Sequence, residues 1–189
     1  MQNKNKYEII IFGRGGQGAK TMSEIMAQAG VLDGKSVQAF PEFGPERSGA
    51  PVKAFVRISD EPITSHEPIV HPDCFLLLDE SLLTDDYFSL FNFSGSELLI
   101  INTKKTAKEI KEKIHFGGKI IAVDADEISM EIIGEKRPSN VILGRFAFVV
   151  EKIKIENIKK VFREKYLSKI GKEKTEKNIL TIMKAYDTH

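Results

Sequence analysis

The sequence predicts an α/β protein with a Rossmann-like, three-layer αβα sandwich, a mixed but mostly parallel sheet and additional C-terminal helices. Short runs rich in Ile, Val and Leu alternate along the chain with segments in which apolar residues recur at helical spacing. Strands that alternate with helices are typical of parallel sheets. A glycine-rich turn directly follows the first apolar run. The length of 189 residues and the 41% of hydrophobic residues predict a single domain, residues 1–189, with a substantial core.

The first apolar run, Ile-Ile-Ile-Phe at residues 9–12, predicts a buried strand over residues 7–12. The glycine-rich turn comes next, and the spacing of apolar residues predicts a helix over residues 19–31. Glycine permits a tight turn and lets backbone N–H groups approach a ligand, and the helix N-terminus adds partial positive charge. The candidate cofactor-binding residues are therefore Gly13, Arg14, Gly15, Gly16, Gln17 and Gly18.

Three interpretations of this turn stay open. The spacing Gly13-x-Gly15-x-x-Gly18 matches the dinucleotide-binding fingerprint, which also needs a carboxylate at the end of the second strand for the ribose hydroxyls. The second strand is expected over residues 36–40, so Glu42 comes late for that role and follows a proline. The turn could hold a phosphate or another anion, form a protein interface, or only allow the strand and helix to pack closely.

A Pro/Gly-rich loop at residues 41–51 is the second unusual feature. It follows the second strand, so in a parallel sheet it lies at the same edge as the glycine turn. Long loops of this kind often carry binding residues. Alternatively, Glu46 and Arg47 only pair with their neighbours. We expect an interface or site-lining role for Phe43, Glu46, Arg47 and Gly49.

The middle of the chain continues the alternation of strands and helices. Residues 52–58 predict an antiparallel strand near a sheet edge, because only the Pro/Gly-rich loop joins them to the preceding strand. Further strands are expected over residues 74–78, 97–101 and 119–123, and helices over residues 81–91, 104–114 and 124–133.

The last quarter of the chain is helical in pattern. Residues 141–150 are apolar nearly all round, so a helix there must be buried in this chain or in a partner, with Ser139 or Asn140 as its N-cap. Two amphipathic helices follow. Residues 151–177 carry nine Lys and one Arg against five Glu. Their basic faces are either solvated or a docking surface for an acidic protein or nucleic acid.

Signals for catalysis are sparse. The chain has no P-loop and no nucleophile-elbow motif. His66 and His71 flank Glu67 in a Pro-rich loop, where exposed histidines are a better interpretation than a zinc site. The only cysteine, Cys74, cannot form a disulfide within the chain, and an iron–sulfur cluster needs about four cysteine ligands. We therefore expect a cytoplasmic chain that binds no metal. Because the net charge is only +1, we expect that nucleic acid is not a partner. Because the sequence has no long apolar segment, we expect that a membrane is not a partner either.

Together these motifs resemble those of the 2-oxoacid:acceptor oxidoreductase family, in particular its pyruvate:ferredoxin gamma subunits. The resemblance covers nearly the whole chain and departs from the usual pattern at Arg47-Ser48-Gly49. It rests on residues 13–19, 39–41, 43–47, 49–52 and 57–63, with later similarities at residues 123–125 and 140–144.

The resemblance implies a subunit of a complex that oxidatively decarboxylates a 2-oxoacid with coenzyme A to acyl-CoA and CO2, and reduces ferredoxin or flavodoxin. It implies that thiamine diphosphate, Mg and iron–sulfur clusters lie in partner alpha, beta and delta (ferredoxin-like) subunits. This chain would have no catalytic residue, would be inactive alone, and would add Asn140 to the interface or site-lining set. The alternatives are a subunit acting on 2-oxoglutarate, 2-ketoisovalerate or indolepyruvate, or a free-standing nucleotide-binding module.

Overall fold

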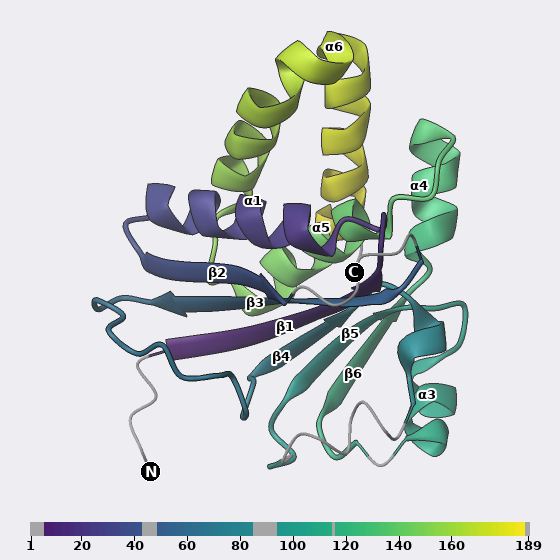
Figure 1. Ribbon diagram of the computed structural model, residues 1–189. Helices are drawn as coiled ribbons and strands as arrows, with labels where there is room; N and C mark the ends of the chain where they lie inside the picture. The colour runs from purple at the N-terminus through teal and green to yellow at the C-terminus, as the bar shows by residue number, and fades with distance from the viewer. Residues whose placement is uncertain (1–5, 43–48, 85–93, 115, 188–189) are drawn as a thin grey trace.

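The computed structural model describes residues 6–42, 49–84, 94–114 and 116–187. A six-stranded sheet forms its centre, with strand order β2-β3-β1-β4-β5-β6 (Figure 1). β1, β4, β5 and β6 run parallel to one another, and β3 pairs antiparallel with both β1 and β2. The strands are β1 (Lys6–Arg14), β2 (Ser36–Glu42), β3 (Pro51–Ser59), β4 (Cys74–Leu77), β5 (Leu98–Asn102) and β6 (Lys119–Val123).

Helices lie on both faces of this sheet. The helices are α1 (Ala19–Leu32), α3 (Ala107–Lys113), α4 (Ala125–Ile133), α5 (Pro138–Val150) and α6 (Ile155–Asp187), with a 3-10 turn, η1, at Glu80–Leu82. α1, α4, α5 and α6 gather on one face, and α3 lies on the other (Figure 1). The sheet separates two apolar clusters, with Ile9 and Ile11 facing the first and Ile10 and Phe12 facing the second. The predicted α/β fold is confirmed.

β3 lies between β2 and β1 in the sheet. It pairs with β1 along the whole of that strand, from Lys6↔Ser59 to Arg14↔Pro51, and with β2 on its other side. The predicted antiparallel strand next to the edge is confirmed. Its insertion separates β2 from β1, although these two strands still run in the same direction.

Three predicted helix boundaries need correction. The helix expected from residue 104 begins at Ala107, because Thr106 caps it: Thr106 Oγ1 accepts a hydrogen bond from Glu109 N, and the Glu109 carboxylate accepts one from Thr106 N. In place of a helix from residue 81, the described residues form only η1 and then leave helical geometry at residues 83–84; residues 85–93 lie outside the described range.

The third correction concerns α5. Neither Ser139 nor Asn140 is its N-cap. The helix begins at Pro138, whose fixed φ suits the first helical position, and Arg137 is the N-cap without a side-chain capping bond.

α5 is buried within this chain, as its apolar sequence requires. Val141, Ile142 and Phe146 are fully inaccessible to solvent. A Cβ atom at Gly144 would lie 2.0 Å from the carbonyl oxygen of Ile182, so the absence of a side chain there lets α6 pack directly against α5. Of the two interpretations that the sequence left open, burial within this chain therefore holds for these residues.

α6 is a helical hairpin. Gly171 interrupts it with φ 78° and ψ 166°, so residues 155–170 and 172–187 form two arms, which rise away from the sheet (Figure 1). Ile158, Phe162, Ile179 and Ile182 are buried. The two predicted amphipathic helices are confirmed.

Candidate functional site

The glycine turn lies at the carboxyl end of β1, where it leads into α1. Gly16 and Gly18 have φ values of 97° and 92°, which side chains with a Cβ rarely adopt. Gly18 is the N-cap of α1 and offers no side-chain cap, and the first turn of α1 contains no acidic residue. The turn therefore combines backbone conformations that need glycine with the positive end of a helix dipole.

The end of the Pro/Gly-rich loop is hydrogen-bonded to the glycine turn. Gly15 N donates to Ala50 O at 2.9 Å, Gly49 N donates to Gly15 O at 3.4 Å, and Arg14 Nη1 donates to Gly49 O at 3.0 Å. The expectation that these two loops meet at one sheet edge is thus confirmed for Gly49. Phe43, Glu46 and Arg47 lie outside the described residues.

A polar network joins the turn to the end of β4. Gln17 Oε1 accepts a hydrogen bond from Arg14 N at 2.7 Å, and Gln17 Nε2 donates to Asp79 Oδ2 at 2.8 Å. Arg14 Nε and Nη2 donate to Ser81 Oγ at 3.0 and 2.7 Å, and Arg14 Nε lies 3.4 Å from Asp79 Oδ2. The polar side chains of Arg14 and Gln17 therefore hold the turn in place.

Asp79 and Ser81 were not among the predicted site residues. The signal available in the sequence was the polar stretch directly after the buried run at residues 74–78. Burial acts to raise the pKa of Asp79, but hydrogen bonds from Ser81 and Gln17 and the charge of Arg14 outweigh it and hold that pKa below its ordinary value. A negative charge thus stands beside the glycine turn at neutral pH.

A crevice of about 490 Å³ opens at this edge, across the carboxyl ends of β1, β4, β5 and β6. Asn102 is one of the residues that line it; its Nδ2 donates to Leu78 O at 3.0 Å, and its Oδ1 accepts from Ala125 N at 2.9 Å. We call this cavity the acidic crevice. Its charged lining residues are Asp79, Glu80, Asp124, Asp126, Glu127, Lys104 and Lys136. This excess of carboxylates disfavours a phosphate group in the crevice.

Glu42 does not reach the glycine turn. It lies exposed in β2, with Oε2 3.8 Å from Lys53 Nζ. Because β3 lies between β2 and β1, Glu42 is two strand spacings from the turn, roughly 9–10 Å. Glu42 therefore does not supply the ribose-binding carboxylate that the dinucleotide interpretation requires.

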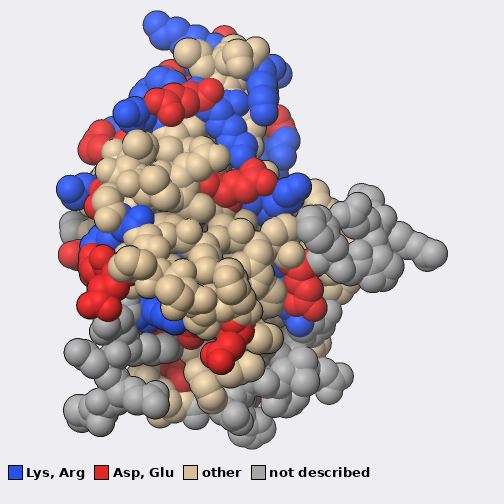
Figure 2. All heavy atoms as spheres, turned by 60° about the vertical axis from the view of Figure 1, so that its left-hand side comes forward, with Lys and Arg blue, Asp and Glu red and all other residues tan. Residues whose placement is uncertain are grey.

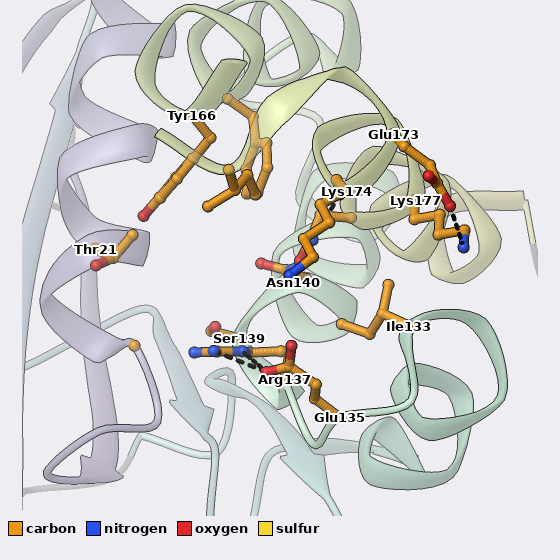
Figure 3. A pocket seen from close by; sticks show the side chains of 14 residues that line it. Thr21, Ile133, Glu135, Arg137, Ser139, Asn140, Tyr166, Glu173, Lys174 and Lys177 are labelled. Carbon is orange, nitrogen blue, oxygen red and sulfur yellow. Dashed lines mark hydrogen bonds and ion pairs between the residues drawn. The ribbon is translucent and has the colours of Figure 1, made fainter. Parts of the chain in front are cut away.

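A second cavity, of about 480 Å³, lies on the other side of the turn, between α1, α5 and the α6 hairpin (Figure 3). Gly18 and Asn140 both line it. Asn140 is 8% exposed, and its Nδ2 donates to Asn178 Oδ1 at 2.7 Å. A Cβ at Gly18 would lie 2.7 Å from Ser139 Oγ. The structure thus brings two predicted site residues, distant in sequence, to one cavity.

Within residues 6–42, 49–84, 94–114 and 116–187, no group of three or more His, Cys, Asp or Glu side chains is placed to hold a metal ion. Cys74 is fully buried, which raises the pKa of its thiol well above the ordinary value. None of the described helices is long and apolar enough to cross a membrane.

Comparison with known proteins identifies the family. The family model described as pyruvate ferredoxin/flavodoxin oxidoreductase matches residues 8–188. The chain belongs to this family. A relative from Thermococcus litoralis, named pyruvate/ketoisovalerate oxidoreductases common subunit gamma, is 43% identical over 168 residues, covering 88% of this chain and 90% of its own. Pyruvate synthase subunit PorC from Thermotoga maritima is 36% identical over 184 residues, covering 97% and 95%.

Solved structures agree with this assignment to the pyruvate ferredoxin/flavodoxin oxidoreductase family. The crystal structure of pyruvate oxidoreductase subunit PORC from Thermotoga maritima matches with a TM-score of 0.86 and 34% identity, covering 97% of each chain. A 2-oxoglutarate:ferredoxin oxidoreductase chain from Magnetococcus marinus, 21% identical with a TM-score of 0.79, contains the same fold in 31% of its length. The resemblance to gamma subunits of this family is confirmed.

Proposed function

We propose that this chain is the gamma subunit of a multi-subunit pyruvate:ferredoxin oxidoreductase. The carboxyl edge of its sheet would bind a ligand or another subunit of the complex. The observation that carries the proposal is the network at the carboxyl edge of the sheet. Arg14 and Gln17, the polar side chains of the glycine turn, are bonded to Asp79 and Ser81. They hold a preformed surface and offer no nucleophile or general base.

The reaction of the complex is oxidative decarboxylation of the 2-oxoacid with coenzyme A as co-substrate, giving acyl-CoA and CO2. Electrons pass to ferredoxin or flavodoxin. We place thiamine diphosphate, Mg and the iron–sulfur clusters in the alpha, beta and delta subunits. The chemistry of the available ligands supports this placement, because a cluster needs about four thiolates and the one cysteine of this chain is buried in the sheet. A cytoplasmic location is consistent with a single cysteine that forms no disulfide within the chain, because thiols stay reduced in that compartment.

Pyruvate is the substrate we favour, because relatives 36–42% identical in Thermotoga maritima and Methanothermobacter marburgensis are named pyruvate synthase subunits. The second candidate is 2-ketoisovalerate. Relatives in Thermococcus litoralis and Pyrococcus furiosus carry a name that assigns one gamma subunit to both substrates. A subunit shared in this way would leave the choice of substrate to other chains.

We propose that the backbone atoms of the glycine turn contact a segment of a partner subunit. Apart from its chain neighbours, no atom of the described residues lies within 4 Å of the position that a Cβ at Gly16 would occupy, so those residues leave the backbone there accessible to an incoming group. The carboxylate of Asp79 makes a partner segment a better occupant of the acidic crevice than a phosphate. Gly49 and the rest of its loop would line the same contact. The position of Glu42 disfavours a free-standing nucleotide-binding module.

The test is reconstitution. Co-expression of the alpha, beta, gamma and delta chains should yield a complex that reduces viologen dye with pyruvate and coenzyme A. Omission of this chain should abolish that activity, and the purified chain alone should show none and bind no iron. Pyruvate turnover by the isolated chain, or full activity of the complex without it, would contradict the proposal.

A further inference from the structure

The 480 Å³ cavity between α6 and the ends of α1 and α4 has an apolar floor. We call it the hairpin groove. Phe162, Tyr166 and Ile170 line it from the first arm of the hairpin, and Ile133 lines it from the end of α4. In Figure 3, Tyr166 extends from α6 toward α1. Ile170 is 37% exposed. Leu167, on the same arm but not among the residues that line the groove, is 43% exposed. A groove that leaves such surface in water is typical of a protein contact.

The rim of the groove has a small excess of basic side chains, three against the two carboxylates of Glu135 and Glu173. It carries Arg137, Lys174 and Lys177. Arg137 pairs with Glu135 at 2.9 Å and Lys177 pairs with Glu173 at 2.8 Å. The Lys174 ammonium forms no ion pair with any carboxylate in the described part of the chain. The charge of Lys174 acts on the neighbouring Glu173, but its ammonium is not held in an ion pair and can therefore pair with a carboxylate of a partner.

Two helices begin at this rim, and their ends add to its positive potential. Neither α1 nor α5 has a side-chain cap or an acidic residue in its first turn. α3 and α4 have both. Because the N-terminus of a helix carries partial positive charge, these two ends reinforce the charge of Lys174.

Basic side chains outnumber acidic ones on α6, although Asp and Glu lie among them (Figure 2). Lys and Arg gather over the upper end of the surface, where the hairpin rises (Figure 2), whereas the acidic crevice lies on the other side of the glycine turn. Much of the basic charge of α6 is already balanced, as in the pairs Arg163–Glu176 and Lys159–Glu156. The remaining charge and the apolar floor suit an acidic polypeptide better than the dense phosphates of nucleic acid.

From these observations we propose that the hairpin groove binds an acidic, amphipathic segment of a partner polypeptide. Apolar side chains of that segment would contact Tyr166 and Ile170, and a carboxylate would pair with Lys174. This inference rests on the proposed function, because the partner meant here is another subunit of the complex.

The experiment measures binding of this chain to the remaining assembled subunits by biolayer interferometry at low and high salt. Lys174→Glu should weaken binding by ~10-fold at low salt and reduce the salt dependence, because it reverses an interfacial charge. Ile170→Ser should weaken binding at both salt concentrations. The matched control is Lys108→Glu, which reverses an exposed lysine of α3 on the opposite face and should bind as the unmodified chain does. Circular dichroism melting verifies that every variant is folded.

Each outcome bears on a different claim. If the unmodified chain neither binds the other subunits nor restores pyruvate oxidation, the proposed function fails. If it does both, and Lys174→Glu and Ile170→Ser bind like Lys108→Glu, the groove proposal alone is overturned. A dimer of this chain that Lys174→Glu dissociates, or Lys174-dependent binding of RNA or inorganic phosphate without an effect on assembly, would also overturn it.

Discussion

Gln17 Nε2 donates a hydrogen bond of 2.8 Å to Asp79 Oδ2, across 62 positions of sequence. The other end of the same amide, Oε1, accepts a hydrogen bond from Arg14 N. A single side chain therefore closes the glycine turn on itself and ties it to the end of β4. The shape of the sheet edge is set before any ligand or partner arrives, which is the property that a binding edge needs.

Gly16→Ala should lower the activity of the reconstituted complex by at least ~10-fold, equivalent to ~1.4 kcal/mol. Because Gly16 has a positive φ of 97°, an alanine at this position should also lower the free energy of unfolding by roughly 1–2 kcal/mol. Gly34→Ala is the matched control, because Gly34 has φ 75° and equally open surroundings at the C-terminal end of α1. Both variants should melt at similarly reduced temperatures, and only Gly16→Ala should lose activity. Equal activities in the two complexes would remove the turn from the functional site.

Asp79→Asn should destabilise the chain at pH 7, and the difference should shrink in acid. The pKa of Asp79 is lowered in the folded chain, so its contribution is fully present above the unfolded value of about 3.9. It is lost as the pH falls through the lower, folded value. Urea unfolding of both proteins between pH 7 and pH 3 tests this: the difference in unfolding free energy should stay constant down to about pH 5 and then decline. A difference that grows in acid would contradict the assignment.

Gly144→Ala should be strongly destabilising. The new Cβ would lie 2.0 Å from Ile182 O, so α5 and the second arm of α6 would have to separate, and overpacking of a core typically costs about 1–3 kcal/mol. Thermal melting should show a clear loss, larger than that of Gly134→Ala. Gly134 has a positive φ but open space around it. Similar melting temperatures for these two variants would show that the close approach of the helices is dispensable.

Arg57→Ala should cost about 3–5 kcal/mol, the usual effect of removing one partner of a buried ion pair. Arg57 is 2% exposed; its Nε donates to Glu8 Oε1 at 2.7 Å and its Nη2 donates to the carbonyl oxygen of Glu67. The double variant Arg57→Met with Glu8→Gln should recover part of that loss, because it removes both charges together. Chemical denaturation of the three proteins measures the effect. An Arg57→Ala protein as stable as the unmodified chain would contradict this role.

The sequence determined the order of the elements. Runs such as residues 9–12 and 74–78 are apolar on both faces of a strand, and glycines with positive φ mark where β1 turns into α1. The Pro/Gly-rich loop also predicted the antiparallel pairing of β3. Each of these signals is local, since it depends on the side-chain period and on backbone conformations that few residues adopt. The apolar pattern did not fix the helix boundaries, because the Thr106 cap and Pro138 at the first helical position decide where α3 and α5 begin.

Only the tertiary structure decided which residues meet at the site. β3 pairs between β1 and β2, which moves Glu42 away from the glycine turn, and the pairing of β4 with β1 brings Asp79 to Gln17. The hairpin of α6 brings Lys174 and Tyr166 beside Gly18. Strand order and helix packing depend on the apolar surface buried between segments far apart in sequence. No local pattern encodes that surface, so the sequence alone named the glycine turn, with Arg14 and Gln17, but not their partners Asp79 and Ser81.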